Sequence, residues 1–467
     1  MHMFRSLGCA LGVAAVLLFS GADARAQLRL PSLQLPLPGR VGPLDTHLLQ
    51  DPLRPVQSVA GQRLDVAREL LRRHADVLRV DPRGFVAVAG QLVAVAPSAA
   101  GLAAAERLGL VRQAEAAGVP GEPEEDAVVI LRVPAGVDAA RVLAQLRLAD
   151  PDGAYDFNHI YFGAEAAMGV AAGRSSGPGD GAGTSGGQRG RSGDGVADGV
   201  ARPGAGALAG TDGAPARAGE RRIGLVDSGV DARHIVFSRA RIEQWGCGGM
   251  ARPAQHGTAV ASLMVGRARR FLGVAPEGHL YAADVYCDEP TGGSADRIAA
   301  ALAWLGRQQV GVINLSIVGP PNVVLERVVA NMIKRGHVLV AAVGNDGPAA
   351  APLYPASYPG VVGVTAVDRN GQVLPEAAQG PQVMFAAPGH QMVSADWESG
   401  AFRAVRGTSF AAPIVAALLA EQVTGPDVAL ARRAVDALRL RAGGVRSPVL
   451  GFGVVGAEFR IDPGVIR

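Results

Sequence analysis

A long stretch with almost no large apolar side chains divides this sequence into two parts. Residues 165–218 include the run "GRSSGPGDGAGTSGGQRGRSGDGVADGVARPGAGALAGTDG". Because the stretch has so little apolar surface to bury, it cannot offset the conformational entropy that ordering would cost. We therefore predict a flexible linker over 165–218, with a folded part on each side. Its "GTSGG" satisfies the G-x-S-x-G pattern, but no strand precedes it and no helix follows, so we do not interpret it as a catalytic motif.

The first residues have the layout of a secretory signal peptide. Arg5 precedes an apolar run over residues 7–19, and "ARA" at 24–26 provides a small-x-small cleavage site. We predict a signal peptide over 1–26, with an uncleaved membrane anchor as the alternative, and a Pro-rich extended segment over 27–55. No later apolar run reaches the roughly 18 residues that span a bilayer. We therefore expect an exported protein, periplasmic or extracellular, with no stable membrane insertion.

Charge and cysteine content narrow the range of partners and cofactors. A formal net charge of +3 over 467 residues gives no reason to expect nucleic acid as a partner. Cys9 lies in the predicted signal peptide, which leaves Cys247 and Cys287 in an oxidising compartment. We predict a disulfide between them, with two separate buried thiols as the alternative. The sequence has no CxxC and no His and Cys cluster at metal spacing, so we predict no metal site.

The part before the linker, residues 56–164, alternates strand and helix patterns. Strands are predicted over 91–96, 110–116, 127–133 and 155–161, and helices over 98–108 and 137–148. This βαββαβ order predicts a small ferredoxin-like α+β domain. An additional helix pattern, "RLDVARELLRRHA", precedes it.

The part after the linker, residues 219–467, has the patterns of an α/β domain. The run "RRIGLVDSGV" is a buried strand pattern that ends in polar residues, and helices and strands alternate after it. Such alternation predicts a doubly wound, mostly parallel sheet with helices on both faces. Ligands bind at the carboxyl ends of the strands in these folds, so functional residues are expected there.

Four polar residues stand at such positions. Asp227 ends a strand, Asn345 follows another behind a glycine, and His256 and Ser409 each open a helix. Taken singly, these have ordinary structural explanations: a turn residue, an Asx turn, a core histidine and a helix cap. Together they are the set that acyl transfer by serine requires, a nucleophile, a base, an orienting carboxylate and an oxyanion donor. We predict that the helix in "GTSFAAPIVAALLA" begins at or just before Ser409, with Pro413 near its first turn.

Five blocks of this part closely resemble the signature motifs of subtilisin-like serine peptidases, in that family's order and roughly its spacing. They are "GLVDSGV", "HGTAVASLMVG", "INLSIVG", "AAVGNDG" and "GTSFAAPIVAALLA", and the resemblance covers about 219–467. It implies that Asp227, His256 and Ser409 form the catalytic triad and that Asn345 donates to the oxyanion, which agrees with the interpretation from the residues themselves.

The resemblance also implies where a peptide substrate binds. The substrate pairs as an added strand along Ser316, Ile317 and Val318, and Gly344 lies in the opposite wall of the first specificity pocket. Val318 stands where the family pattern has glycine, and Leu353 falls near the pocket floor. We therefore predict a preference for small residues, such as Ala or Ser, on the acyl side of the cut bond. The alternative is that Val318 turns outward and Leu353 packs in the core, which leaves a broad apolar pocket.

The domain over 56–164 resembles the propeptide of such enzymes more loosely, by pattern more than by residues. The implied roles are folding assistance and inhibition until cleavage, with the final strand "YDFNHIY" running toward the cleft. A permanent binding or anchoring domain is the alternative. Family members usually carry a longer N-terminal extension that helps bind calcium, whereas only a few residues separate this linker from the Asp227 strand. We therefore predict no cofactor, and the sequence does not support a calcium site.

The leading hypothesis is a secreted serine endopeptidase made as a self-processing zymogen. Its expected partners are polypeptide substrates and its own N-terminal domain. One alternative is a catalytically silent binding protein on the same scaffold, although a complete set of catalytic residues argues against it. Another is an esterase or acyl transferase that uses the same triad, which activity on peptide and ester substrates would distinguish.

Overall fold

The computed structural model describes residues 59–113, 128–163, 220–461 and 463–465. The predicted signal peptide, the Pro-rich segment and the linker over 165–218 lie outside the described residues. No helix in the described ranges is long and apolar enough to cross a membrane.

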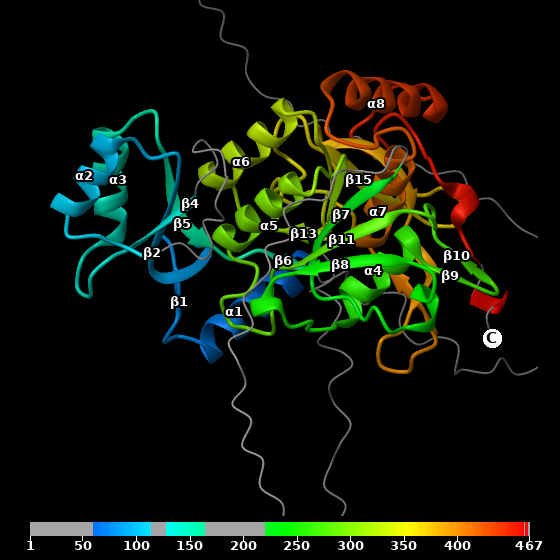
Figure 1. Cartoon of the computed structure of the whole chain (residues 1–467), viewed down its shortest axis with the longest axis horizontal. Helices are drawn as coiled ribbons and strands as arrows, with labels where there is room; N and C mark the ends of the chain where they lie inside the picture. Colours follow the sequence, from blue (N-terminus) through cyan, green and yellow to red (C-terminus); the bar gives the residue numbers. More distant parts are fainter. Residues whose placement is uncertain (1–58, 114–127, 164–219, 462, 466–467) are drawn as a thin grey trace, which may run out of the picture. The chain divides into compact units, whose positions relative to one another are not determined.

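The described residues of this part, 59–113 and 128–163, form an antiparallel sheet with two helices on one face (Figure 1). Strand β2 pairs with β4 and β5, β3 extends the sheet beyond β4, and β1 also pairs with the start of β2. The order β5-β2-β4-β3 is that of the predicted ferredoxin-like unit. The elements are α1 (Val59–Arg73), β1 (Leu78–Val80), β2 (Val86–Val95), α2 (Ala99–Arg107), β3 (Val111–Arg112), β4 (Val128–Arg132), α3 (Ala139–Ala149), β5 (Ala154–His159) and β6 (Phe162–Gly163).

The two faces of β2 have different neighbours, because successive side chains of a strand point to opposite sides. Leu92 and Ala94 pack with residues of α2 and α3. Val93 and Val95 belong instead to a cluster that includes residues of α5 (Ala295–Arg307) and α6 (Val323–Lys334) in the second part of the chain. The sheet therefore contributes one face to its own core and the other to a contact with the α/β part.

The final strand of this part differs from the sequence prediction. A single strand over 155–161 is expected, but β5 ends at His159. The chain then leaves the sheet, and β6 pairs antiparallel with β13 (Ile317–Val318) of the α/β part. The hairpin of β1 and β2 also extends the sheet before the first predicted strand.

Residues 220–461 form a seven-stranded sheet in the order β16-β15-β14-β12-β7-β11-β8, and all of its strand pairs are parallel. The prediction of a doubly wound, mostly parallel sheet is confirmed. Its strands are β7 (Arg222–Asp227), β8 (Arg241–Trp245), β11 (His279–Asp284), β12 (Val312–Leu315), β14 (Val338–Ala342), β15 (Val362–Val367) and β16 (Val383–Pro388). Outside it lie β9 (Arg267–Ala268), β10 (Phe271–Leu272), β17 (His390–Ala395), β18 (Phe402–Arg406) and α8 (Val428–Ala442).

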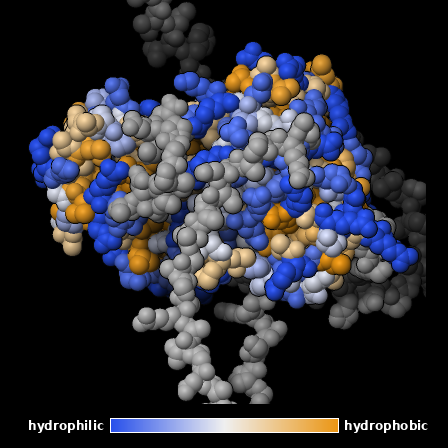
Figure 2. All heavy atoms as spheres, in the orientation of Figure 1, coloured by the Kyte–Doolittle hydropathy of each residue, from blue (hydrophilic) through white to orange (hydrophobic). Residues whose placement is uncertain are grey.

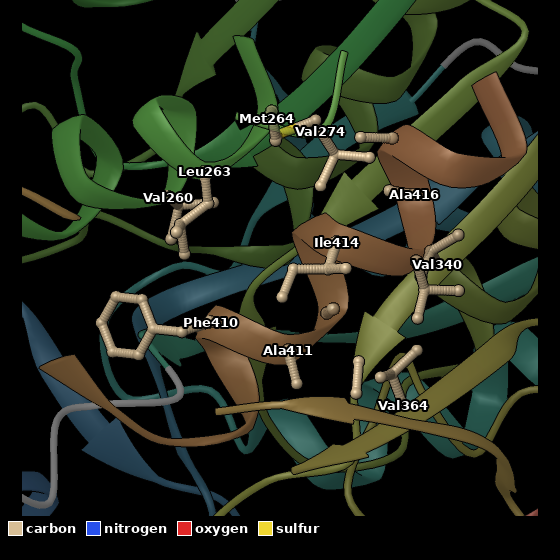
Figure 3. Packing of buried hydrophobic residues seen from close by; sticks show 14 of the residues in the cluster. Val260, Leu263, Met264, Val274, Val340, Val364, Phe410, Ala411, Ile414 and Ala416 are labelled. Atoms are coloured by element: carbon tan, nitrogen blue, oxygen red, sulfur yellow. The ribbon is translucent and has the colours of Figure 1, made fainter. Parts of the chain in front are cut away.

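Helices cover both faces of this sheet. Helices α4 (Gln255–Val265) and α7 (Thr408–Ala420) pack on one face, where Val260 and Met264 share a cluster with Ile414, Val340 and Val364 (Figure 3). Helices α5 and α6 pack on the other face. The visible surface is mostly hydrophilic with smaller hydrophobic areas between (Figure 2). The fold thus buries α4 and α7, the two helices whose first residues the sequence analysis singles out.

Candidate active site

Asp227 and His256 form the first pair of the site. Asp227 is the last residue of β7 and is 1% exposed, and His256 is the second residue of α4. The Nδ1 atom of His256 lies 2.7 Å from Oδ1 of Asp227, and that oxygen also accepts from the backbone N–H of Ser228 at 2.7 Å. A carboxylate that accepts from Nδ1–H fixes the imidazole tautomer whose Nε2 takes up a proton. The pair is therefore arranged as an oriented base.

Glycine at position 257 allows α4 to begin this close to the end of β7. A Cβ on Gly257 would lie 2.0 Å from the carbonyl oxygen of Ser228, which a real side chain cannot do. The N–H of Gly257 donates to Ser228 Oγ at 2.9 Å, which satisfies one of the open donors of the helix start. Any side chain at 257 would move the helix start, and with it His256, away from Asp227.

Ser409 is the second residue of α7, which begins at Thr408 as predicted. Pro413 lies in the second turn of this helix rather than the first. Because proline has no N–H, the carbonyl oxygen of Ser409 lacks its usual donor four residues on. Ser316 Oγ supplies one at 3.0 Å, and Asn314 Nδ2 in turn donates to Ser316 Oγ at 2.8 Å. The strand predicted to bind substrate is thereby tied to the peptide group of Ser409.

Asn345 follows β14 and faces the start of α7. The N–H of Thr408 donates to Asn345 Oδ1 at 3.1 Å, which sets the orientation of the amide. A Cβ on Gly407 would lie 3.0 Å from Asn345 Nδ2 and 3.6 Å from Ser409 Oγ. Gly407 has φ 137°, a conformation that side chains rarely adopt, and its lack of one leaves this corner open. An amide N–H and a hydroxyl thus face the same point, as an oxyanion donor and a nucleophile must.

The four residues predicted from the sequence therefore come from β7, α4, α7 and the end of β14 and gather at the carboxyl edge of the sheet. The His256 ring also packs beside the ring of Phe410, the residue after Ser409, with 5.5 Å between the centroids. Such an arrangement supports proton transfer from a serine hydroxyl and stabilisation of a developing oxyanion.

Residues 160–163 lie along the predicted substrate strand. Gly163 is opposite Ile317 and Phe162 is opposite Val318 in the pairing of β6 with β13. On the other side of the segment, the N–H of Tyr161 donates to the carbonyl oxygen of Gly293 at 2.8 Å. A bridge between Ile160 and Ser294 continues this second wall. The segment is held between two edges, as an extended peptide in a cleft would be.

Sequence reasoning missed Gly293 and Ser294. The signal that marks them is the glycine pair in "TGGS" shortly after β11: a Cβ on Gly293 would lie 2.3 Å from the Tyr161 carbonyl oxygen. Tyr161 itself is fully buried, and its hydroxyl donates to the carbonyl oxygen of Pro320 at 2.7 Å. Its ring lies where a Cβ on Gly319 would stand, at 2.3 Å. Close backbone approach therefore explains glycine at both positions.

Val318 and Leu353 converge on Gly344. Val318 is 2% exposed and Leu353 is 4% exposed, and both belong to the apolar cluster beneath α7. A Cβ on Gly344 would lie 2.5 Å from Leu353 Cδ1 and 3.5 Å from Val318 Cγ1. Val318 therefore does not turn outward to solvent, and the two side chains fill space beside the wall formed by Gly344.

The structure joins Cys247 to Cys287, with sulfur atoms 2.12 Å apart and Cα atoms 5.2 Å apart. This bond connects the segment after β8 to the segment after β11.

Asp284 Oδ1 accepts from the N–H groups of Tyr286 and Cys287 at 2.9 and 3.0 Å. Burial raises the pKa of Asp284, the two N–H bonds lower it, and the charge of nearby Asp227 raises it, with a net pKa above the usual value. Asp284 and the two sulfurs are the one potential metal-ligand cluster within the described ranges, but a disulfide offers no thiolate.

Comparisons with known proteins identify the family of this chain. Residues 220–436 match the model of the Subtilase family. Subtilisin E of Bacillus subtilis (strain 168) is 31% identical over 211 residues, which are 42% of this chain and 53% of that protein. Subtilisin DY of Bacillus licheniformis is 31% identical over 207 residues, 42% of this chain and 73% of that protein. The chain belongs to the subtilase family.

The comparisons cover parts of longer proteins. The chain spans about half the length of subtilisin E, at 53%. Among solved structures, fervidolysin from Fervidobacterium pennivorans, described as a keratinolytic enzyme related to subtilisin, is similar with a TM-score of 0.57 and 17% identity. That likeness covers 82% of this chain and 62% of fervidolysin, and at this identity it concerns the fold alone.

Proposed function

We propose that this chain is an exported serine endopeptidase made as a self-processing zymogen. The observation that carries the proposal is one arrangement of side chains. His256 lies 2.7 Å from Asp227, while Ser409 Oγ and Asn345 Nδ2 face the same corner above Gly407. Family membership and the approach of β6 to β13 support it independently.

The proposed mechanism is acyl transfer through Ser409. Ser409 Oγ attacks the scissile carbonyl carbon while His256 Nε2 takes the hydroxyl proton. Asp227 stabilises the imidazolium, which then gives the proton to the leaving amine and breaks the C–N bond. Water attacks the acyl-enzyme in the same way and releases the acid.

Stabilisation of the tetrahedral intermediate falls to Asn345 and the start of α7. The Asn345 amide and the N–H of Ser409 donate to the oxyanion, and each such donor contributes roughly 3 to 4 kcal/mol to the transition state. The bond from Ser316 Oγ to the Ser409 carbonyl oxygen holds the nucleophile against the strand that pairs with substrate. Substrate and nucleophile are thereby positioned by one strand.

The described part of the N-terminal region supports the zymogen proposal. Residues 160–163 lie between β13 and Gly293, in the position proposed for a peptide substrate. Gly163 is opposite Ile317, the residue after Ser316, whose Oγ donates to the Ser409 carbonyl oxygen. We propose that self-cleavage falls after Gly163, in the part of the chain that precedes the α/β domain.

The proposed substrates are polypeptides with a small residue, such as Ala or Ser, before the cut bond. The support is the convergence of Val318 and Leu353 on Gly344, which removes volume that a large side chain would need. Overfilling a well-packed site costs about 1 to 3 kcal/mol.

The test compares the full-length chain with its Ser409→Ala variant by intact-mass measurement and peptide hydrolysis. We expect the wild type to be cut between Gly163 and Glu220 and to hydrolyse peptides, and the variant to do neither. Cutting of purified Ser409→Ala, with no other protease present, would contradict self-processing. Ester hydrolysis without any peptide hydrolysis by the wild type would instead favour an esterase.

A further inference from the structure

We propose that α1 is an inhibitory clamp that holds residues 160–163 in the substrate cleft, fastened by the ion pair between Arg63 and Asp346. This inference rests on the proposed peptidase function. Helix α1 precedes the βαββαβ unit, so its position does not follow from that unit. Its ordinary explanation is a helix that merely covers the hairpin of β1 and β2.

One face of the described part of α1 carries its apolar, half-buried side chains. Val66, Ala67, Leu70 and Leu71 are half-buried at a spacing of three and four residues, as on the packed face of an amphipathic helix. Arg63 continues this stripe by one step toward the N-terminus and is also half-buried. Away from this stripe, Asp65, Arg68 and Arg72 are exposed. Arg63 therefore points toward the same side as the apolar stripe.

The stripe packs on a small apolar cluster that the cleft segment shares with the hairpin of β1 and β2. Leu78 and Val88 belong to this cluster together with Ile160 and Phe162, which are 2% and 8% exposed. Alternate side chains of an extended segment point to opposite sides, so Ile160 and Phe162 face α1 while Tyr161 enters the α/β domain. Helix α1 thus packs against the apolar cluster that holds two side chains of the segment whose backbone pairs with β13.

The ion pair fixes the N-terminal end of the clamp beside the catalytic site. Arg63 Nε lies 2.6 Å from Asp346 Oδ2, and the side chains are 19% and 6% exposed. Asp346 follows Asn345, the proposed oxyanion donor. Burial raises the pKa of Asp346, whereas Arg63 lowers it by favouring the carboxylate. Removing one partner of a buried pair is costly because it leaves the other charge uncompensated.

This arrangement separates activation into two steps. Cleavage of the peptide bond does not by itself open the cleft, because residues 160–163 stay paired and covered. Release requires the apolar stripe and the ion pair to break together. The clamp therefore sets the delay between self-cleavage and the appearance of peptidase activity.

The experiment uses full-length wild type, Arg63→Ala and, as the matched control, Arg68→Ala. Arg68 lies on the exposed face of α1, with 74% of its side chain exposed. Self-cleavage is followed by mass measurement, and hydrolysis of a fluorogenic peptide is followed in the same sample. We expect Arg63→Ala to be cut at the wild-type rate but to shorten the delay at least about tenfold. Arg68→Ala should match the wild type.

A second variant tests the apolar part of the clamp without touching the ion pair. Leu71→Ala should also shorten the delay, and Arg63→Lys, which keeps the charge, should restore most of it. An unchanged delay in both Arg63→Ala and Leu71→Ala would overturn the clamp. Absence of hydrolysis by the wild type would overturn the proposed function instead.

Discussion

The proposed catalytic centre and the contact between residues 59–163 and the α/β domain are held by different forces. Every residue of α7 is buried, and Ser409 is fixed by apolar packing and by the hydrogen bond that Ser316 Oγ donates to its carbonyl oxygen. The contact at the start of α6 is instead a polar network. His159 Nδ1 lies 2.8 Å from Asn322 Nδ2, and Asp156 Oδ2 accepts from the N–H of Val323 at 3.1 Å.

This difference matches the different lifetimes that the two regions would need in the proposed zymogen. Close packing permits few alternative arrangements, so a catalytic geometry built on it persists. Polar groups regain hydrogen bonds to water when a contact opens, so a polar contact can be separated without unfolding either side. The apolar contact of Val93 and Val95 with α5 and α6 also holds the two parts together, but it involves only one face of the N-terminal sheet.

The largest expected effect concerns the disulfide, which lies in the α/β domain together with the proposed catalytic centre. In the Ser409→Ala background, replacing Cys247 and Cys287 by serine should lower the free energy of unfolding by about 3 to 4 kcal/mol. The reason is that the bond closes a loop with a sequence separation of 40, which restricts the unfolded chain. Urea unfolding would measure the change. Two titratable thiols in the denatured, unreduced protein would contradict the bond itself.

A smaller effect is expected for the residue before the cut bond. Peptides that carry Phe or Leu there should have kcat/KM values about tenfold to a hundredfold below those with Ala, since Val318 and Leu353 occupy the space. Val318→Gly should narrow the difference by opening that space. Equal or higher kcat/KM for Phe in the unmodified enzyme would refute the small pocket and leave the peptidase proposal intact.

The smallest effect concerns Asp81, in the polar network. Its Oδ2 lies 2.9 Å from Arg83 Nε and 3.2 Å from His159 Nε2. Burial alone raises the pKa of Asp81, but hydrogen bonds from His159, the Phe85 N–H and Arg83 outweigh it and leave the pKa well below its usual value. The stabilisation is therefore fully present above the unfolded pKa, near 4, and is lost as pH falls toward the lower folded pKa.

Asp81→Asn in the Ser409→Ala background should lower stability by about 1 to 2 kcal/mol at neutral pH. The difference in the free energy of unfolding between Asp81→Asn and its Ser409→Ala parent should shrink as pH falls below about 4. Urea unfolding at a series of pH values measures both, with Asp65→Asn on the exposed face of α1 as the control. A difference that stays constant down to pH 2 would exclude a charge effect.

The positions of the proposed catalytic residues in the fold were predictable because their neighbours in the sequence carry the signal. Asp227 ends a strand of the sheet, and Ser409 opens a helix of small apolar residues, so strand and helix patterns alone place both. The second wall of the cleft was not predictable in the same way, because Gly293 acts through its backbone carbonyl and the signal is only a pair of glycines. The bond from Ser316 to the Ser409 carbonyl depends on Pro413 together with a distant strand.

The path of residues 155–163 could not be predicted from the local sequence pattern. The alternating residues predict one strand. No residue in that strand pattern marks the point at which the chain leaves the sheet of residues 59–163 and pairs with β13. That exchange is decided by contacts distant in sequence, such as Tyr161 with Pro320 and Phe162 with α1. Helix α1 itself was predicted, but its place over the cleft was not.

The most direct test of the central claim, that Ser409 is an activated nucleophile, is chemical labelling of the processed wild-type protein. A serine-reactive organophosphonate should modify one hydroxyl per chain, and peptide mass spectrometry should locate it at Ser409. Peptide hydrolysis should fall in proportion to that label, and His256→Ala should not be labelled at a comparable rate. Full peptide hydrolysis by protein whose Ser409 is labelled, or labelling of another serine with loss of activity, would contradict the account.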